Sequence, residues 1–306
     1  MTVSGNVVLT GASGFIGSHL RSRLAKLPHV RLVLIGRRPP GQLRSNELFI
    51  ERDLESLDAT AFQRYGIESL AAVFHFGAFT PKNAAQADDA QSIFGANVCG
   101  TRRLLEALPC DPDVFVFAST LDVYGRTESR LTERSQLEPI SLYGASKLYG
   151  EYDVRAHCKR RNIRCAVLRF GHIYGPGEGA YEKLIPKTIA LLLCGERPML
   201  AGDGSATRDF LYVGDAVEAT MRAAFACDRS IDAVNIVSGT SRTLRETVEA
   251  LKRATRSSAE IRYTDAAAGA SVAFDNRFMQ QTLGSWEFES FEGGIEKEVA
   301  DARRSR

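Results

Sequence analysis

The sequence predicts an α/β protein built on a Rossmann-type, doubly wound parallel sheet. Three observations support this prediction. Short apolar runs alternate with amphipathic stretches from the first residues onward, as expected when helices cover both faces of a parallel sheet. A glycine-rich turn joins the first apolar run to the first amphipathic stretch. The pattern changes after about Arg169, where glycine and proline become frequent.

The expected strands are short runs of nearly continuous apolar residues, as strands buried on both faces of a sheet require. They lie at residues 7–10, 32–35, 48–50, 72–76, 114–117 and 165–168. Apolar residues at helical spacing predict a first helix over residues 15–27 and longer helices over about 88–108 and 142–159. Strands that alternate with helices are joined by crossover connections, so we expect them to run parallel.

The chain is expected to form two lobes. Residues 1–170 contain the alternating pattern and are predicted to form the dinucleotide-binding domain. Residues 171–306 are predicted to form mainly a smaller α/β lobe that binds the substrate, with the chain crossing back to the first sheet. Further helices are expected at residues 183–194 and 213–226. Thr243 and Glu246 have the spacing of a capping box, which predicts another helix.

Charge and cysteine spacing narrow the class of function. The 306 residues carry 39 basic and 37 acidic side chains, so the net charge of +2 gives no reason to expect a nucleic-acid partner. None of the six cysteines forms a C-x-x-C pair or stands at zinc-ligand spacing with histidine, so we expect reduced thiols and no metal site. No apolar run approaches the roughly 20 residues of a membrane helix, and no signal-peptide pattern is present. We therefore expect a cytoplasmic protein without a membrane partner.

A glycine-rich loop follows the first strand directly and opens the first helix. Gly11 permits a tight turn, Gly14 lets the backbone approach a pyrophosphate, and Gly17 allows the helix to pack closely on the strand. The N-terminus of the helix would then direct N–H groups and a positive dipole end at the phosphates. A loop that serves only packing is the alternative, but all three glycines stand where phosphate binding needs them. The predicted cofactor contacts in this loop are Gly11, Ser13, Gly14, Phe15, Ile16 and Gly17.

The end of the second strand bears on the choice of cofactor. Sites that prefer NAD usually carry an acidic residue there, which binds the ribose hydroxyls. This chain carries Gly36 followed by Arg37 and Arg38, and an arginine can pair with the 2′-phosphate of NADP. We therefore expect NADP(H) rather than NAD(H), with a solvated turn as the alternative role of the two arginines.

Two further strand ends are expected to contact the cofactor. Asp53 and Leu54 follow the third strand, where the edge of an adenine ring could be met. Gly77 and Ala78 end the fourth strand, across which the cofactor would lie. Each pair alone is also compatible with an ordinary turn, so these contacts depend on the glycine-rich loop for support.

Tyr143 and Lys147 form a Y-x-x-x-K pattern at the start of a long predicted helix. Residues four apart share one helix face, so the Lys147 ammonium can lie near the Tyr143 phenol. A free tyrosine has a pKa of about 10, and a nearby positive charge favours the phenolate. Tyr143 could then exchange a proton with a substrate hydroxyl while a hydride moves to or from the cofactor. The pattern alone occurs by chance, and its position after the fifth strand is what makes it informative.

The fifth strand ends in Ser119 and Thr120, at the carboxyl edge where ligand sites of parallel α/β sheets gather. Either hydroxyl could hydrogen-bond the substrate oxygen that Tyr143 protonates, and capping of the strand end is the alternative role. Because Tyr143 and Lys147 follow downstream, we predict a substrate-facing role for Thr120 in preference to Ser119.

Together, these segments resemble the extended short-chain dehydrogenase/reductases, the family of UDP-galactose 4-epimerase and the sugar-nucleotide dehydratases. The resemblance rests on the glycine-rich start, the Ser-Thr-x-Asp-Val-Tyr-Gly segment and the Y-x-x-x-K pattern. Further similar segments lie at residues 97–101, 168–177 and 202–215. The resemblance covers roughly residues 6–285, and the combination of motifs is highly specific.

The resemblance implies an enzyme that binds a nicotinamide cofactor and a nucleotide-sugar substrate. The implied cofactor contacts also include Asn97, Lys147 and Phe170. Arg208 would contact the diphosphate of the substrate, because a guanidinium is suited to bidentate phosphate binding. The resemblance also implies a homodimer, paired through the helices expected over residues 91–108 and 142–159.

Three positions depart from the family pattern. His172 stands where the family usually has asparagine, so either an imidazole makes that substrate contact or the histidine is structural. Residues 265–270 lack the arginine that the family often carries there, which leaves the nucleotide undetermined. Asp122 takes the place of the glutamate with which the family's dehydratases abstract a proton, and its neighbour Leu121 is apolar. 4,6-Dehydration is therefore disfavoured, and a capping or solvated Asp122 is preferred to a proton-abstracting one, while Asp122 is still expected among the substrate contacts.

The predicted function is NADPH-dependent reduction of a nucleotide-linked 4-keto sugar. Tyr143 would donate the proton, Lys147 would tune its pKa, and Thr120 would orient the substrate oxygen. The main alternative is an NAD-dependent 4-epimerase of nucleotide sugars, which would use the same three residues. A 4,6-dehydratase and a non-catalytic cofactor-sensing protein are less favoured, the latter because all three residues are intact.

Overall fold

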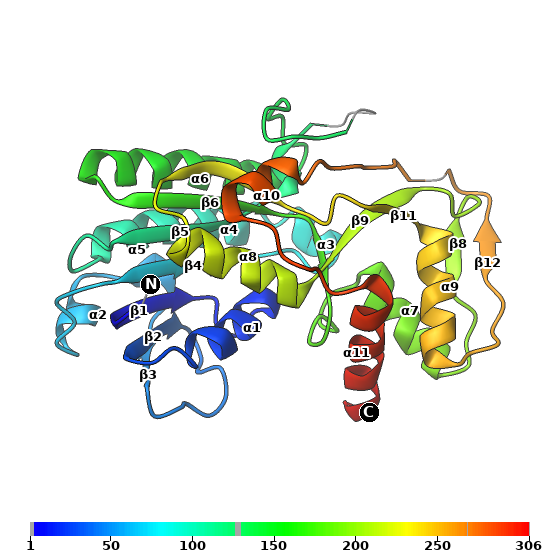
Figure 1. The fold of residues 1–306 in the computed structure, drawn as a ribbon, viewed down its shortest axis with the longest axis horizontal. Coiled ribbons are helices and arrows are strands. Elements are labelled where there is room, and N and C mark those ends of the chain that lie inside the picture. The colour runs from blue at the N-terminus through cyan, green and yellow to red at the C-terminus, as the bar shows by residue number, and fades with distance from the viewer. Residues whose placement is uncertain (1–2, 126–129, 268, 306) are drawn as a thin grey trace. The chain divides into compact units, whose positions relative to one another are not determined.

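The computed structural model describes residues 3–125, 130–267 and 269–305 of the chain, and Figure 1 shows the order of their helices and strands. The chain forms two compact units. Unit 1 comprises Met1–Gly125, Gln136–Phe170 and Val217–Val234. Unit 2 comprises Arg126–Ser135, Gly171–Ala216 and Asn235–Arg306.

Unit 1 is built on a seven-stranded sheet with the strand order β10-β6-β5-β4-β1-β2-β3. Its strands are β1 (Gly5–Thr10), β2 (Val30–Gly36), β3 (Glu47–Glu51), β4 (Ala72–His75), β5 (Val114–Thr120), β6 (Arg164–Phe170) and β10 (Ile231–Ile236). The neighbours from β3 to β6 all pair in parallel. The chain moves outward from β1 to β3 and then returns to β4, which confirms the predicted doubly wound sheet. Ligands of such sheets bind at the carboxyl ends of the strands where this reversal occurs.

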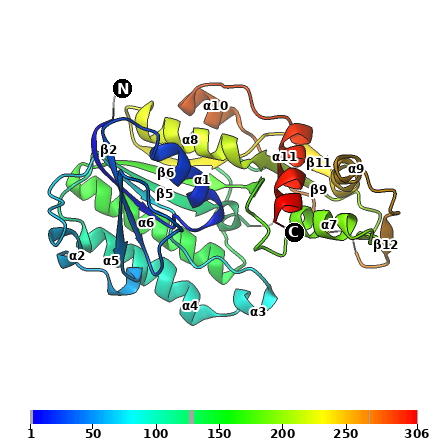
Figure 2. The same ribbon diagram turned by 90° about the horizontal axis from the view of Figure 1, so that it is seen from below.

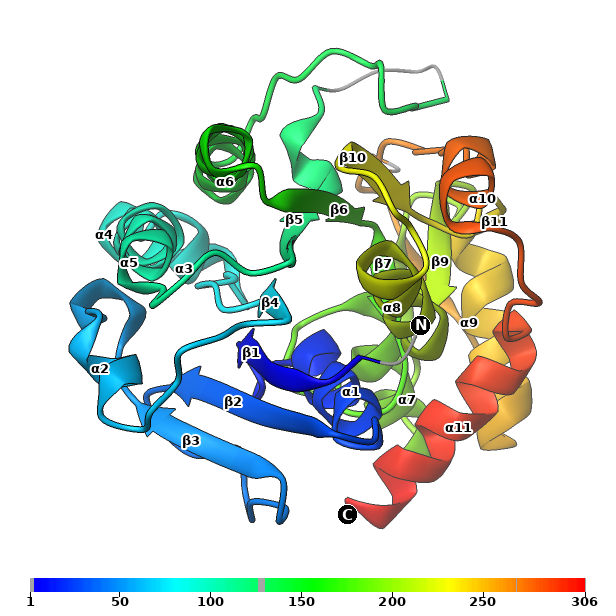
Figure 3. The same ribbon diagram turned by 60° about the vertical axis from the view of Figure 1, so that its left-hand side comes forward.

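Helices cover both faces of this sheet, as Figure 3 shows. One face carries α1 (Phe15–Leu24) and α8 (Val213–Phe225). The other face carries α4 (Ala90–Phe94), α5 (Gly100–Ala107) and α6 (Leu142–Arg161). Short helical turns in the connections are α2 (Thr60–Gln63), α3 (Ala84–Ala87), η1 (Leu54–Ser56) and η3 (Leu121–Val123).

The helical stretch expected over residues 88–108 contains a change of helix type. A π-helical turn, η2 (Gly95–Cys99), separates α4 from α5 without a break in the chain's helical course. Its one buried residue is Asn97, whose side chain turns inward and bonds to neighbouring elements. Such turns insert an extra residue into a helix and are frequent at functional sites.

The long helix α6 is fixed at both ends and along its length. Ser141 caps its start by accepting a hydrogen bond from the Gly144 backbone N–H at 3.0 Å, and Asn162 ends it in a left-handed conformation with φ of 56°. Gly150 allows α6 to lie directly on β5, because a Cβ at this position would lie 2.6 Å from the Phe117 ring. The helix that carries Tyr143 and Lys147 is therefore held at a set distance from β5.

Unit 2 contains two small sheets, with the strand orders β11-β9-β7 and β12-β8. Their strands are β7 (His172–Tyr174), β8 (Met199–Ala201), β9 (Thr207–Tyr212), β11 (Ser241–Thr243) and β12 (Arg262–Thr264). The helices are α7 (Leu184–Leu193), α9 (Leu244–Thr255), α10 (Arg277–Leu283) and α11 (Phe291–Arg304). Side chains from α7, α9 and α11 meet Tyr174 in one hydrophobic core.

The predicted capping box is confirmed at the start of α9, where Thr243 and Glu246 exchange hydrogen bonds between side chain and backbone. Figure 2 shows α9 beside α7 and α11, which together cover the core of unit 2. Within the described residues, no helix combines the length and the apolar composition that crossing a membrane requires.

Candidate active site

The glycine-rich loop packs tightly against the segment that follows β4. Gly11 has a φ of +75°, and a Cβ at this position would lie 2.5 Å from the carbonyl carbon of Phe76. A Cβ on Gly17 would lie 2.0 Å from the carbonyl oxygen of Gly11, and one on Gly14 would lie 3.2 Å from the same oxygen. Larger residues at Gly11 and Gly17 would displace backbone atoms, so both glycines are required for this close approach.

The loop fits a phosphate-bearing cofactor. Helix α1 begins directly after Gly14, and no side chain of the described residues caps this end of the helix. The first turn of α1, all of it described, contains no acidic residue that would compete with an anion. Ser13 is exposed on the loop, Ile16 is half-buried and Phe15 is buried. The positive end of the helix dipole thus lies beside a loop with little side-chain bulk, an arrangement that binds pyrophosphate in Rossmann folds.

The residues predicted at the ends of β2 and β3 lie near each other. The Arg37 side chain is 80% exposed, and its Nε lies 3.9 Å from a carboxylate oxygen of Asp53. Arg38 is also exposed. Asp53 accepts a hydrogen bond from the Glu55 backbone N–H at 3.2 Å and so caps the short turn that contains Leu54. The long contact leaves the Arg37 guanidinium accessible to a ligand.

The end of β4 approaches both the glycine-rich loop and Leu54. The Gly77 backbone N–H donates to Thr10 Oγ1 at 2.9 Å, and a Cβ on Gly77 would lie 3.0 Å from Leu54 Cδ1. Ala78 follows and is half-buried. The ring of Phe76 packs on the ring of Phe170, the last residue of β6, with 5.6 Å between their centroids. The predicted cofactor residues of unit 1 therefore gather along the carboxyl ends of neighbouring strands.

The predicted catalytic residues lie on β5 and on the first two turns of α6. Thr120 ends β5, and its Oγ1 accepts a hydrogen bond from the Asp122 backbone N–H at 3.2 Å. The next turn packs against the start of α6, because a Cβ on Gly144 would lie 2.2 Å from the Asp122 carbonyl oxygen. Tyr143, which precedes Gly144, is half-buried. This packing brings the end of β5 to the helix turn that carries Tyr143.

Lys147 is buried, with only 2% of its surface exposed. Its ammonium nitrogen lies 4.1 Å from the centre of the Phe117 ring, so the ring face supplies a cation–π contact. Burial lowers the pKa of Lys147 to about 7, an effect that the carboxylate of Glu151 opposes. The charge of Lys147 is therefore set by its depth in the protein and by one acidic neighbour on the same helix.

A buried ion pair that the sequence analysis did not identify lies next to this site. Arg169 binds Glu151 with two hydrogen bonds, of 2.9 Å and 2.7 Å, and also donates to the Tyr124 hydroxyl at 2.8 Å. Ser119 donates to the same Glu151 carboxylate at 2.5 Å. The Ser119 hydroxyl is thus committed to the ion pair, which agrees with the preference for Thr120 as the substrate-facing residue.

Asn97 connects the segment after β4 to α6. Its side chain accepts a hydrogen bond from the Phe79 backbone N–H at 2.7 Å and donates to the Phe79 carbonyl oxygen at 3.1 Å. It also donates to Ser146 Oγ at 3.0 Å, one residue before Lys147. Asn97 is 2% exposed, so these contacts position backbone and helix from within the interior.

Asp122 is accessible to solvent, but the protein around it still raises the pKa of its carboxyl group through desolvation. A carboxylate with a raised pKa holds its proton more readily than a free aspartate does. The Asp122 backbone packs against Gly144, shortly after Thr120 in the chain.

Two predicted substrate residues belong to unit 2. Arg208 on β9 donates to the carbonyl oxygens of Thr207 at 2.8 Å and Ala270 at 2.6 Å. His172 lies on the neighbouring strand β7, paired with Phe210. Part of its side chain is accessible, yet desolvation, together with the charges of Arg208 and Lys183, lowers its pKa to about 4. His172 is therefore a neutral imidazole beside a cationic Arg208.

The segment at residues 265–270 reaches the same place, since Ala270 is one acceptor of the Arg208 guanidinium. Residue 268 of this segment lies outside the described residues. Across the described residues, no group of three or more histidine, cysteine, aspartate and glutamate side chains could hold a metal ion.

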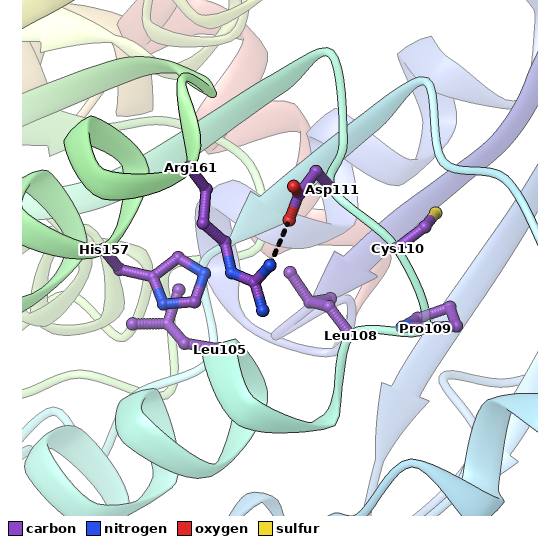
Figure 4. A pocket seen from close by; sticks show the side chains of 7 residues that line it. All are labelled: Leu105, Leu108, Pro109, Cys110, Asp111, His157 and Arg161. Carbon is purple, nitrogen blue, oxygen red and sulfur yellow. Dashed lines mark ion pairs between the residues drawn. The ribbon is translucent and has the colours of Figure 1, made fainter.

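A hollow of about 320 Å³ lies at the opposite edge of the sheet (Figure 4). Arg161 crosses it and pairs with Asp111 at 3.3 Å, while His157 lines its side. Asp111 and Arg161 precede the starts of β5 and β6, so the hollow lies at the amino ends of the strands. None of the predicted site residues lines it, and ligands of such sheets bind at the other edge.

Comparison with known proteins assigns this chain to a family. The sequence profile described as the NAD dependent epimerase/dehydratase family matches residues 7–236. The chain belongs to the NAD-dependent epimerase/dehydratase family. This confirms the resemblance to the extended short-chain dehydrogenase/reductases and the expected enzyme class.

Two relatives illustrate the range of this epimerase/dehydratase family. The chain is 30% identical over 231 residues to the uncharacterized UDP-glucose epimerase YtcB of Bacillus subtilis, covering 69% of this chain and 70% of the relative. It is 31% identical over 230 residues, or 70% of its length, to a trifunctional UDP-glucose 4,6-dehydratase, 3,5-epimerase and reductase of Arabidopsis thaliana. The match spans only 34% of that plant protein, about a third of its length.

Solved structures of the family superpose on nearly the whole chain. The UDP-glucuronic acid 4-epimerase of Bacillus cereus, in complex with UDP-glucuronic acid and NAD, has a TM-score of 0.85 at 26% identity and covers 99% of this chain and 100% of its own. The protein MoeE5, in complex with UDP-glucuronic acid and NAD, has a TM-score of 0.86 at 31% identity, with 99% and 100% coverage. The fold is therefore an NAD(P)-binding fold, but these complexes give no support to the expected preference for NADP(H).

The buried histidine of β4 leads to a prediction about pH and stability. His75 is fully buried, and burial, followed by the charge of Lys147, lowers its pKa to about 3 from 6.5. At a pH between these two pKa values, His75 carries a proton in the unfolded chain but not in the folded chain. The free energy of unfolding therefore decreases as the pH falls. The slope reaches at most about 1.4 kcal/mol per pH unit.

We expect urea denaturation between pH 4 and pH 7 to show this slope in the wild type and to show less of it in His75→Gln. The exposed His29 provides a control, because His29→Asn should retain the wild-type slope. Equal slopes for the wild type and His75→Gln would contradict the assignment of a neutral, buried His75.

Proposed function

We propose that the protein is a nucleotide-sugar 4-epimerase that uses a bound nicotinamide cofactor. The observation that carries this proposal is the position of the first turns of α6 at the carboxyl end of β5. The turn that carries Tyr143 packs through Gly144 on the Asp122 backbone, just after Thr120, and Lys147 lies over the Phe117 ring of β5. Several structural neighbours are UDP-sugar 4-epimerases, one of them the Thermotoga maritima UDP-glucose 4-epimerase with a TM-score of 0.85 at 26% identity. These similarities favour the 4-epimerase over the 4-ketoreductase that the sequence first suggested.

Within this proposal, Tyr143 exchanges a proton with the hydroxyl on the reacting sugar carbon. The nicotinamide ring, when bound, supplies the chemistry of hydride acceptance and return. Thr120 orients the same oxygen from the end of β5, where the following segment packs against the first turn of α6. Because a general base works best when its pKa is near the operating pH, Tyr143 needs a cation close to its phenol.

Lys147 provides that cation from a buried position. The pKa of Lys147, about 7, lies below the usual value of 10.5. Lys147 therefore loses its charge in the neutral pH range. The charged form is favoured as the pH falls, so its effect on Tyr143 strengthens below neutrality. Glu151 raises the pKa of Lys147, which retains more of the charge than burial alone would allow.

Unit 2 supplies the proposed substrate contacts. Arg208 would bind the diphosphate of the nucleotide sugar, because its guanidinium is cationic and already held in place by two carbonyl oxygens. His172 would add a neutral imidazole donor beside it. Asp122 would lie near the sugar. Its side chain is one methylene shorter than the glutamate that abstracts a proton in the family's dehydratases.

An NADPH-dependent 4-ketoreductase is the second candidate, and one observation favours it. The described segment that ends β2 contains no acidic residue, because Gly36, Arg37 and Arg38 occupy it. The accessible Arg37 guanidinium suits a 2′-phosphate, and NADPH suits an enzyme that must renew its cofactor in every turnover. The choice of cofactor therefore distinguishes the two candidates.

The first prediction concerns Tyr143. Tyr143→Phe removes the phenol that exchanges the proton, and we expect a loss of about 10²- to 10⁴-fold in kcat for conversion of a UDP-sugar. Tyr65→Phe is the control, because Tyr65 is 36% exposed and lies outside α6 and outside the proposed contacts. Turnover at the wild-type rate in Tyr143→Phe would overturn the assigned mechanism.

The second prediction concerns the cofactor. Under the 4-epimerase proposal, the purified protein releases stoichiometric NAD on denaturation, and NADPH binds no more tightly than NADH to the stripped protein. Preferential, reversible binding of NADPH would instead select the 4-ketoreductase. In that case Arg37→Ala should weaken NADPH about tenfold by loss of a charge-assisted bond, while Arg31→Ala, at the other end of β2, should not.

We also propose a homodimer that pairs through α4, α5 and α6. Three aromatic side chains on this face are exposed: Phe94 by 38%, Tyr149 by 51% and Tyr152 by 55%. Figure 3 shows α4, α5 and α6 next to one another on one side of the unit 1 sheet. Exposed aromatic residues are enriched at protein interfaces, because they bury large areas at a low entropic cost.

The third prediction concerns this face. Light scattering at micromolar concentration should show a dimer for the wild type and a monomer for Tyr152→Asp, because a buried, unpaired carboxylate opposes association. Tyr65→Asp is the control, since Tyr65 is 36% exposed on another part of unit 1. A monomeric wild type, or a Tyr152→Asp variant that dimerises as the wild type does, would remove the support for the dimer.

A further inference from the structure

His75 lies at the centre of a buried chain of hydrogen bonds. On one side, its Nδ1 lies 2.7 Å from Thr10 Oγ1, which also accepts the backbone N–H of Gly77 at 2.9 Å. Thr10 precedes Gly11 at the end of β1, and Gly77 follows the end of β4. His75 therefore bonds to the side chain of the residue that immediately precedes the glycine-rich loop, and the same hydroxyl accepts the backbone N–H of Gly77.

On the other side, the chain runs to helix α6. His75 Nε2 lies 2.9 Å from Thr101 Oγ1, which donates to the Asn97 carbonyl oxygen at 2.6 Å. The Asn97 side chain donates to Ser146 Oγ at 3.0 Å, and Ser146 donates to the Tyr143 carbonyl oxygen at 2.7 Å. These bonds join the end of β4 to the helix turn that carries the proposed catalytic tyrosine.

The protons along this chain can be assigned from its partners. Thr101 has a single hydroxyl proton and donates it in the hydrogen bond to the Asn97 carbonyl oxygen, so Thr101 Oγ1 must accept the hydrogen bond from His75 Nε2–H. His75 Nδ1 then accepts a hydrogen bond from the Thr10 hydroxyl. Every bond points the same way only when the imidazole is neutral and protonated at Nε2.

His75 also packs near the proposed catalytic lysine. The imidazole and Phe117 rings have centroids 5.7 Å apart, and the Lys147 ammonium lies 4.1 Å from the centre of the Phe117 ring. An imidazolium at this position would add a second cation beside Lys147, whose charge already disfavours protonation of His75. A neutral His75 therefore keeps the environment of Lys147 free of a competing charge.

We propose that His75 is a positioning residue that couples the glycine-rich loop after β1 to the helix that carries Tyr143. The proposal rests on the cofactor and the catalytic tyrosine assigned under the proposed function. His75 touches neither group, and acts through the hydrogen bonds on its two ring nitrogens. A shift of the imidazole would move Thr10 and Gly77 on one side and Thr101 on the other.

The first test is spectroscopic and needs no turnover. In protein labelled with ¹⁵N-histidine, His75 should show the neutral Nε2–H tautomer at every pH from 5 to 8. Thr101→Val removes the acceptor of Nε2–H with little change in shape and should shift His75 toward the Nδ1–H tautomer. A charged imidazole in this range, or an unchanged tautomer in Thr101→Val, would overturn the proposal.

The second test measures cofactor binding by protein fluorescence, with whichever of NAD⁺ and NADPH binds the wild type more tightly. Thr101→Val should weaken binding about tenfold, because a small displacement of a positioning loop has an effect of this size. Thr247→Val is the matched control: Thr247 is also fully buried and also donates to the carbonyl oxygen four residues before it, at 2.9 Å, but it lies in unit 2. Equal weakening in the two variants would indicate a general loss of stability and contradict the proposal.

A double variant tests whether the bonds act as one chain. Ser146→Ala breaks the hydrogen-bonded chain at its far end. It should also weaken cofactor binding, although Ser146 is fully buried and does not reach the surface. If Thr101 and Ser146 belong to one chain, the double variant loses less affinity than the product of the single losses. Fully multiplicative losses would refute coupling through His75. A wild type that binds cofactor but converts no nucleotide sugar would refute the proposed function alone.

Discussion

The ion pair between Arg169 and Glu151 is the constraint on which the position of α6, the helix of the proposed catalytic residues, depends. Both side chains are nearly inaccessible to solvent, at 2% and 0%. They connect β6 to α6, while Ser119 and Tyr124 bring β5 and the segment after η3 to the same charges. Removal of one member of such a buried pair typically costs about 3–5 kcal/mol, because the other charge is left without a partner. Helix α6 is therefore held by the buried Arg169–Glu151 ion pair and by the packing of Gly150 on the Phe117 ring.

The parallel arrangement of the strands places the proposed site at the carboxyl edge of the sheet. Parallel strands bring their ends together, so residues from distant parts of the chain meet along one edge. The tight loop at Gly11 suits an anion, whereas the interior behind it holds a neutral imidazole and a lysine with a lowered pKa. Burial favours uncharged forms of both bases, and only Lys147 has a carboxylate near enough to oppose that effect.

The sequence was sufficient to predict the features that local spacing encodes. The strand–turn–helix at the glycine-rich loop and the capping box of α9 each depend on residues within a few positions of one another. Residues that act across long separations gave no such signal. The His75 side chain bonds to Thr10, 65 residues away in the sequence, and Arg169 on β6 bonds to Glu151 on α6, 18 residues away. The π-helical turn at Asn97 was also missed; the inward-facing Asn97 side chain bonds to Phe79, which lies far from it in the sequence. The preference for NADP(H) depended on one turn, which is too little to decide a cofactor.

The central claim is that this site interconverts nucleotide sugars at one carbon by internal return of the same hydrogen. The most direct measurement is ¹H NMR of UDP-glucose, UDP-glucuronic acid and UDP-N-acetylglucosamine, each incubated with the purified protein in D₂O without added cofactor. We expect at least one of them to reach equilibrium with its 4-epimer, and the product to carry no deuterium at C4. Absence of any 4-epimer, or a product that has gained deuterium at C4, would rule out the proposed 4-epimerase.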